Sequence, residues 1–209
     1  MDVSNPLRSV SPSVDADVLQ VLVRSHGWLT GLKVATLANR SYAQVRSVLH
    51  RLVADGLVEV EDHGSAYAYR CNRHHLIYEA IDAVVGAADR VEERLLDRVA
   101  RWDPPAYAVV LYGSFARHDG DADSDLDLLV VRPDDVDEDD DAWVRQRQML
   151  AAEAERWTGN RTQVLELSRT ELASALDRGE ALIASLRRDG RVLVGPPAPE
   201  LFEGTGISS

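Results

Sequence analysis

Two carboxylates separated by one residue, Asp125 and Asp127, lie in the segment SDLDLLVV at 124–131. The other residues of this segment are strongly apolar and predict a buried strand, on which side chains two positions apart point to the same face. Two neighbouring carboxylates on a buried strand repel each other unless a cation or a proton lies between them. Because carboxylate oxygens are hard ligands, the pair predicts a Mg²⁺ site.

A phosphate-binding turn is predicted just before this strand. Residues 107–112 are apolar and predict a strand, Gly113 and Ser114 follow at once, and residues 115–117 begin a helix. Glycine allows the backbone to turn and a phosphate to approach closely, and the start of a helix presents free N–H groups to an anion. The Ser114 hydroxyl and the Arg117 guanidinium, one turn later, could add hydrogen bonds to phosphate oxygens.

The combined pattern resembles the nucleotidyltransferases of the DNA polymerase β superfamily, and it is most similar to the minimal type. The pattern is a strand, Gly-Ser, ten residues (115–124) and Asp-x-Asp on the next strand. The resemblance implies that Asp125 and Asp127 hold two Mg²⁺ ions bound to a nucleoside triphosphate, with ATP expected. It implies that Gly113 and Ser114 hold the β- and γ-phosphates. An acceptor hydroxyl would attack the α-phosphorus and release pyrophosphate. The alternative is a surface acidic loop between two strands.

A third carboxylate on a later strand usually completes the site in this family, as a metal ligand or as a base. The candidate strand is TQVLELS at 162–168, and its only carboxylate is Glu166. The sequence leaves the register of this strand open, since Gln163 and Leu165 occupy the alternative face. Glu166 is therefore the predicted third ligand or base, with an outward polar residue on an edge strand as the alternative.

The N-terminal part predicts three helices and a hairpin. Helices are expected at 15–25, at 30–38 and at 42–55, where Ser41 is a good N-cap and Gly56 a good C-terminal stop. Residues 57–61 and 66–70 alternate like two strands. This order resembles a winged helix-turn-helix of the MarR and ArsR type, in which the second helix of the motif enters the major groove of double-stranded DNA.

The resemblance implies which residues face DNA. The outward residues of the recognition helix and its flanks are Arg40, Tyr42, Gln44, Arg46, Ser47, His50 and Arg51. The wing would add His63, Ser65 and Arg70. A winged helix that reads a palindrome needs a dimer, so a homodimer is expected. The alternative is a winged helix that docks a partner protein and binds no DNA.

Charge is distributed unevenly along the 209 residues, whose net charge is −12. Residues 24–73 carry +3, whereas residues 81–209 carry the whole −12. This asymmetry favours two domains with different partners. No run approaches the roughly 18 apolar residues of a membrane helix. One cysteine and the absence of an apolar N-terminal stretch favour a cytoplasmic protein without membrane association.

We therefore expect an α/β (α+β) protein. The expected parts are a winged helix-turn-helix domain at 14–73, a connector helix at 74–103, a mixed-sheet nucleotidyltransferase domain at 104–195 and a flexible tail at 196–209. The predicted function is Mg²⁺-dependent nucleotidyl transfer to a hydroxyl of a protein such as a toxin, of RNA or of a small molecule. The alternative is a transcriptional regulator whose nucleotidyltransferase-like domain binds nucleotide without turnover.

Overall fold

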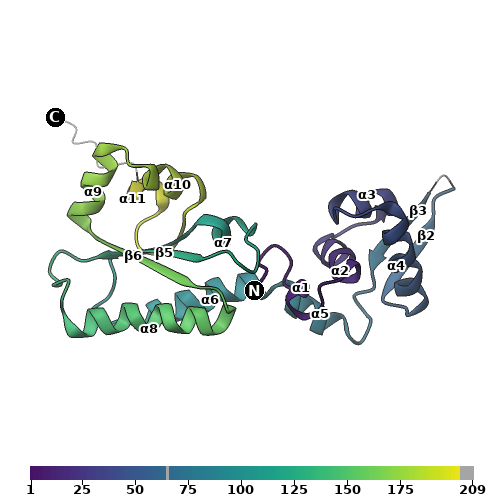
Figure 1. Cartoon of the computed structure of the whole chain (residues 1–209), viewed down its shortest axis with the longest axis horizontal. Coiled ribbons are helices and arrows are strands. Elements are labelled where there is room, and N and C mark those ends of the chain that lie inside the picture. Colours follow the sequence, from purple (N-terminus) through teal and green to yellow (C-terminus); the bar gives the residue numbers. More distant parts are fainter. Residues whose placement is uncertain (65, 203–209) are drawn as a thin grey trace. The chain divides into compact units, whose positions relative to one another are not determined.

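The computed structural model describes residues 1–64 and 66–202. The chain divides into two compact units. One contains Asp2 and Ser4–Ala87, and the other contains Met1, Val3 and Ala88 onwards. Figure 1 shows the elements of each unit. The predicted α/β class with two separate sheets is confirmed.

The N-terminal unit has the predicted order of helices and strands. Its elements are α1 (Leu7–Val10), α2 (Val14–Arg24), β1 (Leu29–Thr30), α3 (Gly31–Leu37), α4 (Tyr42–Ala54), β2 (Val58–Asp62), β3 (Tyr67–Cys71) and α5 (Tyr78–Val85). The three strands form an antiparallel sheet in the order β1-β3-β2. Three helices followed by the β2–β3 hairpin constitute a winged helix-turn-helix.

Local signals explain the bounds of α4. The Ser41 hydroxyl accepts a hydrogen bond from the Gln44 N–H, and the Gln44 side chain accepts one from the Ser41 N–H, which together make a capping box. At the other end Gly56 adopts a φ of +75°, which only glycine reaches without strain. Between them Val45 and Leu49 are completely buried in the core of the unit.

The single connector helix predicted at 74–103 is wrong. The structure has two helices, α5 and α6 (Ala87–Val99), separated at Gly86, where φ is −82° and ψ is 13°. Glycine is a poor helix former, and the apolar residues on its two sides belong to different cores. Val85 packs in the N-terminal core, whereas Val91 and Leu95 pack in the C-terminal core.

The C-terminal unit is built around a four-stranded mixed sheet. After α6 its elements are β4 (Ala108–Tyr112), α7 (Gly113–Arg117), β5 (Leu126–Arg132), α8 (Asp141–Thr158), β6 (Thr162–Ser168), α9 (Arg169–Arg178), α10 (Ala181–Asp189), β7 (Arg191–Val194) and α11 (Ala198–Phe202). The strand order is β6-β5-β4-β7. Strands β5 and β6 are parallel and are joined through α8, whereas β4 is antiparallel to both β5 and β7.

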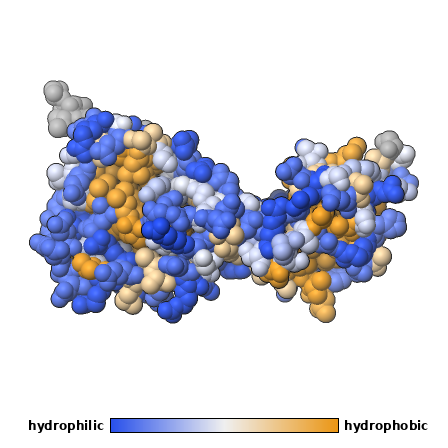
Figure 2. All heavy atoms as spheres, in the orientation of Figure 1, coloured by the Kyte–Doolittle hydropathy of each residue, from blue (hydrophilic) through white to orange (hydrophobic). Residues whose placement is uncertain are grey.

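Helices cover both faces of this sheet (Figure 1). Leu126, Leu128 and Val130 of β5 point towards α6 and α8, and the alternate residues Leu129 and Val131 point towards α9, α10 and α11. Figure 2 shows a strip of hydrophobic atoms within the mostly hydrophilic face of this unit.

The predicted flexible tail at 196–209 is wrong for its first residues. Residues 198–202 form α11, and Phe202 is 1% exposed because it packs on the core beside α10. Residues 203–209 lie outside the described residues. None of the described helices is both long enough and apolar enough to cross a membrane.

Candidate active site

Gly113 and Asp127 form the centre of the candidate site. Tyr112 pairs with Asp127 in the antiparallel register of β4 and β5, so the turn after β4 lies beside this carboxylate. Gly113 has a φ of +73°, and a Cβ placed on it would lie 2.6 Å from Asp127 Oδ2. Both the backbone conformation and the close approach therefore require glycine at this position.

Asp125 lies on the same side of the sheet as Asp127, as the sequence predicts. Burial, and then the negative charge of Asp125, raises the pKa of Asp127 above its ordinary value. Burial, and then Asp127, also raises the pKa of the neighbouring Tyr112. The Gln163 side-chain amide, opposite Asp127 in the register of β6, donates a hydrogen bond to Asp125 Oδ2. The site thus contains two repelling carboxylates and one amide.

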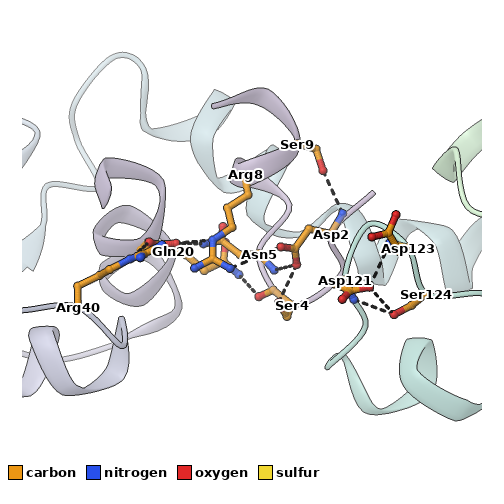
Figure 3. Close-up of polar contacts among 11 residues, drawn as sticks. Asp2, Ser4, Asn5, Arg8, Ser9, Gln20, Arg40, Asp121, Asp123 and Ser124 are labelled. Atoms are coloured by element: carbon orange, nitrogen blue, oxygen red, sulfur yellow. Dashed lines mark hydrogen bonds and ion pairs between the residues drawn. The ribbon is translucent and has the colours of Figure 1, made fainter. Parts of the chain in front are cut away.

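The loop that leads into Asp125 is held by its own hydrogen bonds (Figure 3). The Asp121 carboxylate accepts hydrogen bonds from the Ser124 hydroxyl at 2.8 Å and from the Asp123 N–H at 3.1 Å. The buried Asn160 amide donates to the carbonyl of Ser124 at 2.9 Å and to two others of this loop. These contacts fix the backbone immediately before the first carboxylate.

Ser114 and Arg117 lie on α7, directly after Gly113. A Cβ on Gly120 would lie 3.0 Å from Ser114 Oγ, so the loop passes close to this hydroxyl. The Arg117 guanidinium donates to Asp119 Oδ2 at 2.9 Å and to Asp189 Oδ2 at 2.8 Å. In this state Arg117 is paired with carboxylates of the chain, and a phosphate would have to replace them.

Glu166 does not join the two aspartates, so its prediction as third ligand or base is wrong. It pairs with Val130 in the parallel register of β5 and β6, on the face covered by α6 and α8, whereas Asp127 is on the opposite face. There its carboxylate is bound by Arg132 at 2.8 Å, by Arg147 at 2.5 Å and by the Trp143 indole N–H at 2.9 Å. The alternative register, with Gln163 and Leu165 towards the aspartates, is the one observed.

The donor set fits a hard cation. Asp125 and Asp127 supply carboxylate oxygens, and a cation between them would remove the repulsion that raises the pKa of Asp127. Within residues 1–64 and 66–202, no group of three or more His, Cys, Asp or Glu residues is arranged to hold a metal. Any further oxygen ligands would therefore come from neutral groups such as the Gln163 amide, from water or from a bound phosphate.

Some of the predicted DNA-facing residues are exposed on α4, and others are engaged in contacts within the chain. Arg46, Ser47 and His50 are exposed on the outward side of α4, and Tyr42 is 46% exposed. Gln44 caps α4, as described above, and its side-chain oxygen accepts from Ser41.

Arg40 and Arg51, the two predicted phosphate contacts, are paired with carboxylates of the chain. Arg51 pairs with Asp15 and, at 3.7 Å, with Asp55. Arg40 donates to the buried Asp17 at 2.6 Å, and Arg8 binds the same carboxylate at 2.6 Å (Figure 3).

Asp17 is the buried carboxylate that both Arg8 and Arg40 bind. Burial by itself would raise the pKa of Asp17, but hydrogen bonds from Arg8 and Arg40 outweigh it, so the pKa lies below its ordinary value.

On the wing, Arg70 pairs with Glu59 at 2.5 Å and His63 lies 3.3 Å from Glu61. The predicted wing residue Ser65 lies outside the described residues.

Two families match the chain, one in each unit. Residues 92–173 match the profile of the nucleotidyltransferase domain. The C-terminal unit contains a nucleotidyltransferase domain. Residues 13–83 match the profile of the sugar-specific transcriptional regulator TrmB, so the winged helix-turn-helix is of the TrmB type. No curated protein matches the chain.

Three solved structures are similar to this chain at low sequence identity. A toxin-antitoxin with AMP-PNP is 19% identical, with a TM-score of 0.37 over 53% of this chain and 79% of its own. A mutant of the toxin-antitoxin MntA-HpeT is 18% identical, with a TM-score of 0.35 over 54% of this chain and 83% of its own. TrmBL2, an archaeal chromatin protein, is 17% identical, with a TM-score of 0.28 over 85% of this chain and 72% of its own.

Two residues that shape the candidate site were assigned no role from the sequence. Asn160 is 1% exposed and holds the loop before Asp125, but a single Asn after a helix gives no sequence signal for such a role. Gln163 contacts Asp125, and only the register of β6 identifies it. The sequence left both registers open, with Gln163 on the alternative face.

Proposed function

We propose that the nucleotidyltransferase domain binds a nucleoside triphosphate with Mg²⁺ and transfers the nucleoside monophosphate to a hydroxyl group. The observation that carries the proposal is the pairing of Asp125 and Asp127 on one face of the sheet, against the backbone of Gly113. A half-buried carboxylate pair is costly without a cation, and Gly113 lets the backbone at the start of α7 approach this pair closely.

Each residue then has a defined part in the reaction. Asp125 and Asp127 would hold Mg²⁺, which when bound neutralises phosphate charge. Gly113 and Ser114 would contact the β- and γ-phosphates, and Arg117 would exchange a carboxylate for a phosphate oxygen. The acceptor oxygen bonds to the α-phosphorus, the bond to the bridging oxygen breaks, and pyrophosphate leaves with the electron pair. The acceptor proton passes to water.

The position of Glu166 favours a second candidate function. With Gln163 and Leu165 on the aspartate face, the site has an amide where a third carboxylate would otherwise stand. A domain of this composition could bind Mg²⁺ and nucleotide and respond to them without turnover. In that case the nucleotide would regulate the N-terminal unit, and introducing a carboxylate by Gln163→Glu would create or strongly raise transfer.

The two functions are separated by measuring binding and transfer on the same protein. The chain is incubated with Mg²⁺ and ATP labelled at the α-phosphate, and a cell extract supplies protein, RNA and small-molecule acceptors. We expect labelled product with the wild type and with the exposed-acid control Asp135→Asn. We expect none with Asp125→Asn combined with Asp127→Asn. Equal labelling by that double variant would overturn the enzymatic proposal.

Binding is then followed with a fluorescent ATP analogue. Mg²⁺-dependent binding without any labelled product would identify the second candidate. Absence of both binding and product would overturn the two functions together. The same experiment repeated with GTP, CTP and UTP gives the base preference.

We further propose that the N-terminal unit binds double-stranded DNA through α4. The exposed Arg46, Ser47 and His50 support this proposal, as does the match to a transcriptional regulator. Because phosphate contacts release counterions, affinity for a duplex from upstream of the gene should fall steeply with salt. Arg46→Ala with His50→Ala should abolish this binding, whereas Arg24→Ala, at the end of α2, should not. Binding that is independent of salt and of α4 would contradict the proposal.

A homodimer is proposed with this DNA-binding function. Two copies would present two recognition helices to the two halves of a palindrome. Sedimentation of the chain alone and with the duplex measures the number of copies. One copy per duplex, at protein concentrations that saturate the DNA, would contradict a dimeric reader.

A further inference from the structure

A groove between α6 and α8 lies on the surface of the C-terminal unit and has a volume of about 630 Å³. Arg94, Arg98 and Arg101 line it from the side of α6, and Arg156 lines it from α8. The spacing of four residues places Arg94 and Arg98 along one side of α6, and Arg101 follows just after the end of this helix. The groove therefore presents a row of guanidinium groups.

The charge of this groove is opposite to that of its unit. Its four arginines face two carboxylates, Asp97 and Glu153, which gives a net +2. Arg98 is paired with Glu153 at 2.6 Å and so connects the two helices. Among the described residues, no carboxylate lies within ion-pair distance of the other three arginines. By contrast, residues 88–209 carry 15 basic and 26 acidic side chains, a net −11.

Apolar and aromatic surface accompanies the arginines. Met149 lines the groove and is 48% exposed. The Trp157 ring also lines the groove, with the Arg94 guanidinium 5.7 Å from its centroid. Arginine, tryptophan and methionine are the residues enriched in protein–protein interfaces. Met149 also adapts easily to a partner because its side chain is flexible.

We propose that this groove binds an amphipathic helix of a partner protein, with an apolar stripe flanked by acidic residues. Such a helix would place its apolar stripe on Met149 and Trp157 and its carboxylates against Arg94, Arg101 and Arg156. Binding of this groove to the same groove of a second chain is disfavoured, because such a symmetric contact would bring two net-positive surfaces together. A long nucleic acid is disfavoured because the unit around the groove is strongly negative.

The test uses the full chain and three fluorescent probes. The first is a peptide with leucines at helical spacing and glutamates on both sides, the second has lysines in place of the glutamates, and the third is a single-stranded oligonucleotide. We expect the glutamate peptide to bind and the other two probes not to bind, as measured by fluorescence anisotropy. Failure of the glutamate peptide to bind, or tighter binding of the oligonucleotide, would overturn the proposal.

Matched variants separate the groove from overall charge. Arg94→Glu combined with Arg156→Glu should lower the affinity for the glutamate peptide at least about tenfold. Arg145→Glu with Arg178→Glu changes the net charge equally outside the groove and should alter affinity less than about twofold. The neutralising pair Arg94→Gln with Arg156→Gln gives the same comparison if the charge reversal impairs folding, which circular dichroism reports. Equal weakening by the groove pair and the control pair would refute a specific site.

Discussion

Asp127→Asn should stabilise the C-terminal unit in the absence of metal, although Asp127 is central to the proposed function. Its carboxylate lies against the backbone of Gly113 and beside Asp125, and burial together with the charge of Asp125 raises its pKa. Asparagine has nearly the same shape and no charge. The substitution therefore removes the repulsion and the burial of a charge while leaving the packing unchanged.

The size of the effect follows from Coulomb's law. Two carboxylates two positions apart on one face of a strand are separated by about 6.6 Å. At an effective dielectric constant of about 20 this repulsion is about 2.5 kcal/mol, and exposure to solvent reduces it. We expect Asp127→Asn to raise the free energy of unfolding in EDTA by about 1–2 kcal/mol.

Tryptophan fluorescence during urea unfolding reports this change. Trp102, Trp143 and Trp157 lie in the C-terminal unit and only Trp28 lies in the other, so the signal follows mainly the C-terminal unit. Addition of Mg²⁺ and ATP should stabilise the wild type but not the variant, which reverses their order. A variant that is less stable than the wild type in EDTA, or that gains equally from Mg²⁺ and ATP, would refute the reasoning.

Four further substitutions test the site and its supports. Gly113→Ala should abolish nucleotide binding and destabilise the unit by about 2 kcal/mol because of its positive φ, measured by calorimetry and urea unfolding. Glu166→Gln leaves two arginines without their carboxylate and should lower the free energy of unfolding by about 3 kcal/mol without changing nucleotide affinity. A loss of nucleotide affinity would show that Glu166 belongs to the binding site. Asp189→Asn removes one of the two carboxylates that hold Arg117, the other being Asp119, and should tighten nucleotide binding several-fold, whereas unchanged binding would exclude Arg117 from phosphate contact. Asp17→Asn should lower the free energy of unfolding of the N-terminal unit by about 2–3 kcal/mol at pH 7. Because the pKa of Asp17 is lowered on folding, its stabilisation is complete above the ordinary value of about 4 and is lost as the pH falls through the folded value. The stabilities of wild type and variant should therefore converge as the pH is lowered below the ordinary value.

The sequence predicts most of the fold because local signals agree with the packing. Ser41 and Gly56 define α4, and the alternation around Asp127 defines which side chains of β5 share a face. The pairing of Asp125 and Asp127 follows from the period of a strand alone. The turn at Gly113 follows from a glycine between a strand and a helix, and its φ of +73° agrees with that position.

The rest depends on contacts between segments that are distant in the chain. Which face Glu166 occupies depends on the register of β6 against β5, and a shift by one residue would exchange Glu166 with Gln163. The ion pair of Arg40 could not be predicted because its partner, Asp17, is 23 residues away and buried by tertiary packing. The break at Gly86 was hidden because an apolar period of three and four continues across it, although the two stripes face different cores.

The charges around the site determine what nucleotide binding must change. Two carboxylates and a triphosphate are all anionic, so Mg²⁺ alone leaves negative charge that an arginine of the chain must offset. Arg117 is the arginine placed next to Ser114, and it is held by Asp119 and by Asp189, whose side chain is 6% exposed at the end of α10. Asp189 is also bound by Arg188 at 2.7 Å and stays paired when Arg117 leaves. Nucleotide binding would therefore break the contact between α7 and the end of α10 at little electrostatic cost. A transferase can use this exchange to admit its substrate, and a regulator can use it to report that the nucleotide has bound.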